Sequence, residues 1–239
     1  GSGKHNNWSL GTDNGVNLFK PGKEPNKNLQ FLCVLACLME AVNKHALLLR
    51  AAASNTGNDH RLGANEAPPA IISIYMGDQL GEIVDAIVAG VPFDQLPCAE
   101  VGTLDLGVST LPVLPKDPTD RNRTSPFAFT GNRFEFRMVA SSVSIGDANT
   151  VMNSMIAESF NKACDALEGA EDFEKAAIDY IYKTMKENKN IVFNGNGYSD
   201  EWVEEAAKRG LPNVKSIVDA IPAYTDESSI EMFEKLGVM

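Results

Sequence analysis

The sequence has no long uninterrupted apolar run and no basic, apolar targeting segment. A helix that crosses a bilayer needs about 20 consecutive apolar residues, and a cleavable targeting segment combines a basic start with an apolar centre. The longest apolar stretch, residues 29–49, is interrupted by Glu40, Asn43, Lys44 and His45. We therefore expect no membrane partner.

Positive charge is also scarce along the chain. The 239 residues include 32 Asp and Glu but only 21 Lys and Arg, which gives a formal net charge of −11. A nucleic-acid surface needs clustered Lys and Arg side chains opposite the phosphates, so we expect no nucleic-acid partner. An anionic substrate would have to be bound by a few well-placed arginines.

Cysteine is rare, since the chain has only four, and they lack the spacing of metal ligands. This usage is typical of a reducing compartment, and we expect a cytoplasmic protein. Cys33 and Cys37 lie one helical turn apart among apolar residues and are predicted to pack in the core. The chain starts at Gly1 rather than at a Met, and we interpret it as a piece of a longer polypeptide.

Residues 133–138 alternate strictly between charged and apolar side chains, which is typical of a half-buried strand. One face carries Phe134, Phe136 and Met138, and the other carries Arg133, Glu135 and Arg137. The charged face has two interpretations. It is either a solvated face with cross-strand ion pairs or a polyanion site, in which a carboxylate holds a divalent cation and arginines bind phosphate and carboxylate oxygens.

A second polar face, near the start of the chain, favours the site. After a Gly-rich entry, His5, Asn7 and Ser9 alternate with other residues and share one face of a predicted strand. This face offers an imidazole, an amide and a hydroxyl. A lone histidine is more often structural, but its combination with the Arg-Glu-Arg face points to a binding site.

Four motifs, in order along the chain, resemble those of the glutamine synthetase family. They are Gly-Ser-Gly-Lys-His-Asn-Asn-Trp-Ser-Leu at residues 1–10, Arg61-Leu62 followed by Asn65-Glu66-Ala67-Pro68, Arg121-Asn122-Arg123, and Arg133-Phe134-Glu135-Phe136-Arg137. Residues 120–127 and 197–202 are most similar to type III members of the family. The resemblance runs through the whole chain, and the shared order of four motifs makes it specific.

The resemblance implies ATP-dependent amide formation. In this reaction the γ-carboxylate of glutamate is phosphorylated, and ammonia then displaces the phosphate to give glutamine. The family implies ATP and Mg²⁺ or Mn²⁺ as cofactors, glutamate and ammonia as substrates, and a ring-type homo-oligomer for the intact enzyme. Two alternatives stay open: another γ-glutamyl-amine ligase of the same fold, and a non-catalytic folded fragment or oligomerisation module.

The resemblance also assigns roles to individual residues. The implied metal ligands are His5 and Glu135, and the implied catalytic residues are Glu66, Arg123 and Arg133. Glu66 matches the flap glutamate, which shields the intermediate and takes a proton from bound ammonium. The implied glutamate-binding residues are Gly1, Arg61 and Arg137, and the implied ATP-binding residues are Asn7, Ser9, Arg123 and Arg133.

Three positions depart from the family pattern. Asn7 stands where many members have a second histidine, Ala128 stands where commoner types have an arginine, and the spacing from Arg61 to Glu66 is one residue shorter. In the family, further metal carboxylates and an N-terminal domain precede the segment that starts at Gly1. We therefore expect this chain to hold about half of a site and to be inactive in isolation.

The expected fold class is α+β, a curved antiparallel sheet from a barrel-like catalytic domain with helices outside it. Residues 1–195 are assigned to the C-terminal part of that catalytic domain, and residues 196–239 to a truncated helical segment characteristic of type III. A hairpin is predicted over residues 4–19, a strand over residues 70–76, and short strands and turns over residues 91–116.

Helical patterns cover most of the remaining chain. They predict helices over residues 29–53, 79–89, 149–167 and 171–186, one from Ser199 and a short one near the end. The expected N-caps are Asn28, Asp78 and Ser228, the last in a capping box with Glu231. The expected inward side chains of the helix at 171–186 are Phe173, Ala177, Ile181 and Met185, and His45 is interpreted as structural.

Overall fold

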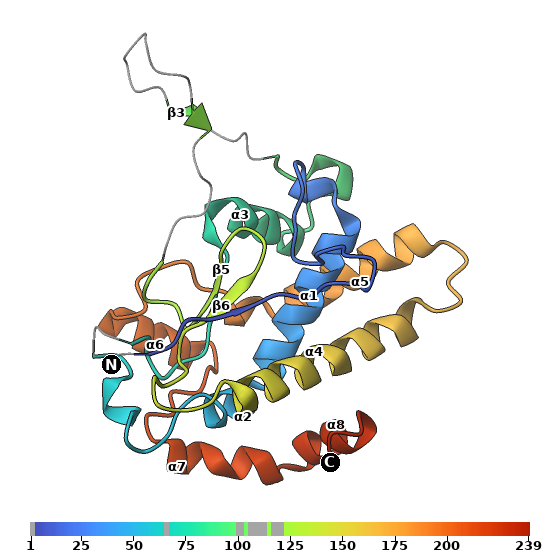
Figure 1. Ribbon diagram of the computed structural model, residues 1–239. Helices are drawn as coiled ribbons and strands as arrows, with labels where there is room; N and C mark the ends of the chain where they lie inside the picture. The colour runs from blue at the N-terminus through green and yellow to red at the C-terminus, as the bar shows by residue number, and fades with distance from the viewer. Residues whose placement is uncertain (1–2, 65–66, 99–102, 105–113, 116–121) are drawn as a thin grey trace.

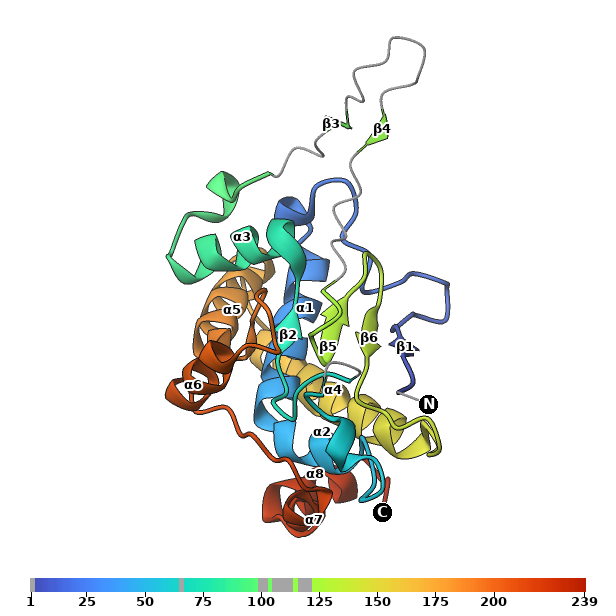
Figure 2. The ribbon, with the colours of Figure 1, turned by 90° about the vertical axis from the view of Figure 1, so that its left-hand side faces the viewer.

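The computed structural model describes residues 3–64, 67–98, 103–104, 114–115 and 122–239. A four-stranded sheet packs against a group of helices, which confirms the α+β fold class (Figures 1 and 2). The order in the sheet is β1 (Asn6–Trp8), β6 (Phe134–Phe136), β5 (Phe127–Phe129) and β2 (Ile74–Tyr75). Within the described residues this sheet is open, with β1 and β2 at its edges.

The sheet is mixed, whereas the sequence suggested an antiparallel one. β1 pairs with β6 and β6 with β5 in antiparallel fashion, but β2 runs parallel to β5. β5 and β6 form a hairpin, closed by the bond from Thr130 N to Arg133 O at 2.9 Å. β2 and β5 are separated by about fifty residues of chain, and this long connection allows the chain to re-enter the sheet in the same direction.

Three shorter predictions for strands are met only in part. The expected hairpin over residues 4–19 is reduced to a bridge between Gly11 and Asn17, because β1 pairs with β6 instead. In the region 91–116, β3 (Thr103–Leu104) and β4 (Leu114–Pro115) form an antiparallel pair. The expected strand over residues 70–76 is confined to the two residues of β2.

Aromatic rings from three strands fill the space between the sheet and the helices. Phe127 stacks on Phe134 with ring centroids 5.2 Å apart, and Trp8 lies 5.3 Å from Phe19. These side chains are buried, and they belong to one continuous core with α1 and α4. The predicted apolar face of residues 134–138 is therefore confirmed.

The predicted helix over residues 29–53 is interrupted at His45. α1 (Leu29–Lys44) and α2 (Ala46–Ala51) are separated at this residue, whose backbone leaves the helical region at φ −106° and ψ 24°. The predicted cap at Asn28 is confirmed, since its side chain accepts a bond from Phe31 N at 3.0 Å. α1 is buried on most sides between α4 (Gly146–Leu167) and α5 (Phe173–Glu187) (Figure 2).

α3 (Gly77–Val88) begins two residues before the predicted start, so the expected cap at Asp78 is wrong. Asp78 lies in the first turn, and the preceding N–H of Met76 donates to Asn194 Oδ1 at 3.0 Å. The hydrogen-bond acceptor at this end of the helix therefore comes from a residue far along the chain. Gly90, with φ 81°, follows the end of the helix.

Phe173 is exposed, although the helical pattern placed it inward. It is the first residue of α5 and is 61% accessible, and it lines an open pocket together with Cys33 and Val34 of α1. The other three predicted inward residues, Ala177, Ile181 and Met185, are buried. Cys164, in the last turn of α4, is exposed.

The end of the chain is helical. α6 (Asp200–Lys208) is capped by Ser199, whose Oγ accepts from Trp202 N at 3.2 Å. α7 (Ile217–Ala220) and α8 (Glu227–Lys235) follow, and the expected capping box at Ser228 is wrong because α8 begins after Asp226. The part of the chain that the structure describes also has five short 3₁₀ segments: Pro25–Lys27, Asp59–Arg61, Phe93–Gln95, Lys189–Ile191 and Ile221–Thr225.

No helix in the described part of the chain combines the length and the apolar character that a membrane crossing requires.

Candidate functional site

The two polar strand faces singled out in the sequence lie side by side. β1 and β6 are neighbours, and Asn7 is directly opposite Glu135. On β1 the side chains alternate as predicted: His5, Asn7 and Ser9 are exposed, while Asn6 and Trp8 are buried. We refer to the surface formed by these exposed β1 residues and Glu135 as the β1–β6 face.

Buried amide contacts hold β1 in place. Asn6 Nδ2 donates to Asn149 Oδ1 at 2.8 Å, and Trp8 Nε1 donates to Asn153 Oδ1 at 2.9 Å, so both inward side chains are fixed to α4. A Cβ on Gly3 would lie 3.2 Å from Val139 O, and the glycine therefore permits the close approach of β1 to the chain beyond β6. The same contacts fix His5 next to Glu135.

His5 Nδ1 lies 3.6 Å from Glu135 Oε2, which confirms the expected approach of the two side chains. The His5 side chain is 63% exposed and that of Glu135 is 15% exposed. An imidazole nitrogen and a carboxylate oxygen at this separation fit two positions around one divalent cation of the Mg²⁺ or Mn²⁺ type. Among the described residues, no third His, Cys, Asp or Glu joins them to form a larger cluster.

Arg137 is buried, in contrast to the other charged residues of its motif. Its side chain is 4% exposed, and its Nε and Nη2 atoms each lie 3.0 Å from Glu135 Oε2. Its Nη1 donates to the backbone carbonyl of Asn122. The guanidinium thus ties the carboxylate of β6 to the turn that carries Arg123, a connection that the strand pattern alone did not reveal.

Arg123 and Arg133 lie at opposite ends of β5. Both side chains are exposed, Arg133 in the β5–β6 turn and Arg123 in the turn before β5. Ala128, where commoner family types have an arginine, is buried and lies opposite Glu135 in the sheet. A small side chain at this position leaves Glu135 next to His5 and Arg137.

Three predicted site residues remain. Arg61 lies in the loop after α2, whereas Gly1 and Glu66 lie outside the described residues. Arg61 ends a 3₁₀ segment, is half-buried and makes an interaction of its own. The loop that leads to Glu66 has a defined base, because Gly63 N donates to Ala67 O at 3.2 Å.

A second His–Glu pair lies at the junction of α1 and α2. His45 Nε2 is 2.6 Å from Glu158 Oε2, and Lys44 Nζ is 2.8 Å from Glu158 Oε1. Burial lowers the pKa of His45. Burial alone would raise the pKa of Glu158, but hydrogen bonds from Lys44 and His45 outweigh it and lower that pKa. A neutral imidazole therefore donates to an ionised carboxylate.

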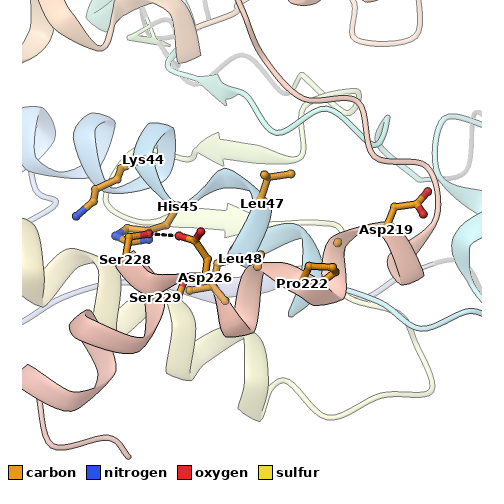
Figure 3. Close-up of a pocket in the computed structure, with 11 residues that line it drawn as sticks. Lys44, His45, Leu47, Leu48, Asp219, Pro222, Asp226, Ser228 and Ser229 are labelled. Atoms are coloured by element: carbon orange, nitrogen blue, oxygen red, sulfur yellow. Dashed lines mark hydrogen bonds between the residues drawn. The ribbon is translucent and has the colours of Figure 1, made fainter.

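A cavity of about 290 Å³ adjoins this second pair (Figure 3). His45 lies next to Ser228 and Asp226 of the C-terminal segment, and Ser228 Oγ donates to Asp226. The cavity is built from α2 and the last helices, and it contains none of the predicted site residues. The interpretation of His45 as structural agrees with its full burial and its close partner.

Comparisons with known proteins extend over the whole chain. Residues 176–239 match the family model of the glutamine synthetase C-terminal domain. The chain is 46% identical over its full length to a glutamine synthetase of Butyrivibrio fibrisolvens, of which it covers 34%. Over 96% of its length it is 47% identical to a glutamine synthetase of Bacteroides fragilis (strain YCH46), of which it covers 32%.

A type-3 glutamine synthetase of Dictyostelium discoideum is also 46% identical over the whole chain, which covers 32% of that protein. The chain thus spans about a third of the length of the curated relatives that it matches. The resemblance drawn from the four motifs is confirmed: from end to end, this chain is similar to glutamine synthetases, the type-3 enzyme among them.

Proposed function

We propose that this chain is part of an ATP-dependent glutamate–ammonia ligase, which forms glutamine through γ-glutamyl phosphate. The observation that supports the proposal best is the meeting of His5 and Glu135 on one sheet face, 3.6 Å apart, with the Arg137 guanidinium in contact with the same carboxylate. The similarity to glutamine synthetases over the full chain gives the reaction class.

The reaction concentrates negative charge at one place, since it brings together a triphosphate, a carboxylate nucleophile and an acyl phosphate. The chain as a whole carries a formal charge of −11, so positive charge must be supplied locally. In the proposed mechanism the exposed Arg123 and Arg133 bind ATP phosphates and the transferred group. Arg137 orients the γ-carboxylate of glutamate, helped by Arg61.

The strand that carries the Arg-Glu-Arg motif has the length that this division requires. Arg133 and Arg137 are four residues apart, or about 13 Å along an extended strand, with Glu135 between them. Ser9 follows Trp8, the partner of Phe134, and so lies at the Arg133 end. This supports an ATP-phosphate end at Arg133 and Ser9 and a glutamate end at Arg137, with Asn7 between them. Arg123 lies near the Arg137 end, where it would contact the transferred group.

His5 and Glu135 are the residues that would hold the divalent cation. When bound, such an ion shields the transferring phosphoryl group and the oxygens around it. The chain's own contribution is to orient these donors: β1 is fixed to α4 through Asn6 and Trp8, and Arg137 fixes the Glu135 carboxylate. Glu66 is proposed to take the proton from bound ammonium.

Glutamine formation by the full-length protein tests the proposal. With ATP, glutamate, Mg²⁺ or Mn²⁺, and either ammonia or small primary amines, we expect preference for ammonia and release of one phosphate per amide formed. A strong preference for an amine would favour a γ-glutamyl-amine ligase instead. The isolated 239-residue chain should form no glutamine, and turnover by this chain would contradict the proposed half site.

A further inference from the structure

The turn that carries Arg123 is attached to the C-terminal part of the chain. Residues 192–197 leave α5 and run beside the edge strand β2, where Phe193 N donates to Ile74 O at 2.9 Å (Figure 2). The same segment then reaches the turn at residues 122–124. We refer to residues 192–197 as the edge segment.

Two hydrogen bonds join the edge segment to the turn. Asn122 Nδ2 donates to Gly195 O at 2.7 Å, and Gly197 N donates to Thr124 Oγ1 at 2.7 Å. The turn is also braced internally, since Asn122 Oδ1 accepts from Thr124 N at 2.9 Å and from Thr124 Oγ1 at 2.6 Å. Arg123 therefore sits between two residues that are each bound to the edge segment.

Gly197 allows this contact because it has no side chain. A Cβ at this position would lie 2.7 Å from the backbone oxygen of Thr124, which is closer than real Cβ contacts come. The neighbour is backbone, so no side-chain rotation could relieve the clash. Any larger residue at 197 would have to push the turn away from the edge segment.

The edge segment is in turn fixed by α6. The rings of Phe193 and Trp202 stack with centroids 3.7 Å apart and an interplanar angle of 8°. Arg209 lies over both rings, 5.4 Å from that of Trp202, and its Nη1 donates to Val192 O at 2.9 Å. The helix thereby holds the edge segment, which holds the turn.

We propose that Asn122, Thr124 and Gly197 are positioning residues, through which the C-terminal segment sets the place of Arg123 beside Arg137. The bond from Arg137 Nη1 to Asn122 O completes the connection, because it links the turn through the Arg137 guanidinium to the Glu135 carboxylate. The catalytic consequence rests on the proposed function, whereas the attachment of the turn does not.

The test uses Thr124→Val, Thr124→Ser and Gly197→Ala in the full-length protein, with two readouts. Trypsin cleavage after Arg123, followed in the native protein by mass spectrometry, measures opening of the turn. Steady-state kinetics measure kcat and the KM values for ATP and glutamate. Thr124→Val removes the hydroxyl at nearly constant volume, and Thr124→Ser keeps it.

For Thr124→Val and Gly197→Ala we expect cleavage after Arg123 to rise about tenfold, and kcat to fall about tenfold at a nearly unchanged melting temperature. Thr124→Ser should restore both values. Gly57→Ala is the matched control, since its Cβ would meet only Asn55 Oδ1, at an ordinary 3.5 Å. That variant should match the parent protein in both readouts.

The outcomes distinguish the attachment of the turn from its role in positioning Arg123. Unchanged cleavage after Arg123 in both disruptive variants would overturn the attachment of the turn. Faster cleavage with unchanged kcat and KM would overturn the positioning role. If the parent protein forms no glutamine at all, the proposed function fails, and the cleavage experiment still decides whether the edge segment holds the turn.

Discussion

The described residues contain two His–Glu pairs, and they differ in almost every physical respect. His5 and Glu135 are 3.6 Å apart on the surface of a sheet, and the histidine side chain is 63% exposed. His45 and Glu158 are 2.6 Å apart, and that histidine side chain is 2% exposed. The first pair has room for a ligand between its atoms, whereas in the second pair the two side chains are hydrogen-bonded to each other.

The cations beside the two pairs are also different. Glu135 is held by Arg137, a buried guanidinium that makes two contacts to one oxygen. Glu158 is held by Lys44, whose side chain is 47% exposed. A planar, buried guanidinium fixes a carboxylate in one orientation, while an exposed ammonium contributes little. The same two residue types thus form a candidate metal site in one place and a structural contact in the other.

The largest expected effect is that of a Glu→Gln substitution in the first pair, and the same substitution in the second pair serves as its comparison. In the full-length protein, Glu135→Gln should lower kcat/KM for glutamine formation by at least about 100-fold, because a neutral amide replaces a carboxylate that would bind the cation. Titration with Mn²⁺ should show a matching loss of apparent metal affinity. Glu158→Gln, made in parallel, should leave the metal titration unchanged; an equal loss in both variants would remove the distinction.

Arg137→Lys should have the next largest effect. It keeps the charge but loses the bidentate fork, so we expect glutamate binding to weaken about ten- to a hundredfold, with ATP binding little changed. Arg133→Lys should mainly lower kcat, since its charge acts as the phosphoryl group transfers. The measurement is kcat and both KM values; identical profiles would contradict the assignment of Arg133 and Arg137 to two separate ends of the site.

Glu158→Gln should lower the stability of the fold rather than its chemistry. It replaces the charged acceptor of the His45 and Lys44 hydrogen bonds with a neutral one, at a side chain that is mostly buried. We expect the free energy of unfolding to fall by about 1–3 kcal/mol. Denaturant titration of the full-length protein would measure this cost. Lys44→Gln is the companion variant, for which we expect less than about 1 kcal/mol because that side chain is half exposed.

The smallest expected effect is the pH dependence of the buried pair. Burial lowers the pKa of His45 in the folded state, so the unfolded chain binds a proton more readily. The stability from neutral His45 is fully present above the ordinary histidine pKa of about 6.5 and is lost as pH falls below it. Melting temperatures between pH 8 and 5 should therefore decline less steeply in His45→Gln than in the parent protein; parallel curves would contradict this.

The two histidines also show how much the sequence could predict. His5 lies in a strand pattern of period two, and that period alone placed it with Asn7 and Ser9 on an exposed face. His45 lies among apolar residues of helical period, which predicted burial. In both cases the neighbours within a few residues determine which way the side chain points, and such information is local to the sequence. The caps at Asn28 and Ser199 were predictable for the same reason.

Contacts between distant segments could not be predicted in this way. The N-terminal end of α3 is capped by Asn194 rather than by the local Asp78, and β2 pairs with β5 in parallel across a long connection. Arg137 has the same alternation as Arg133, yet it is buried because its guanidinium reaches both Glu135 and the Asn122 carbonyl. Each of these depends on which segments the fold brings together.

The exposure of Phe173 has a related cause. Helical periodicity predicts which side of a helix is apolar, but not how closely the neighbouring helix approaches it. Phe173 lies in the first turn of α5 and lines an open, mainly apolar pocket together with Cys33 and Val34 of α1. Its side chain is therefore on the predicted side of the helix, and the unfilled space between α5 and α1 leaves it exposed.

The chain has only two tryptophans, and the fold puts them in different surroundings. Trp8 packs behind the β1–β6 face with its indole N–H bonded to Asn153, while Trp202 lies flat on Phe193 beneath Arg209. Each is therefore an intrinsic fluorescent reporter of one region. In Trp→Phe variants that retain one indole, emission from Trp202 would follow the C-terminal segment during unfolding, and emission from Trp8 would follow the sheet.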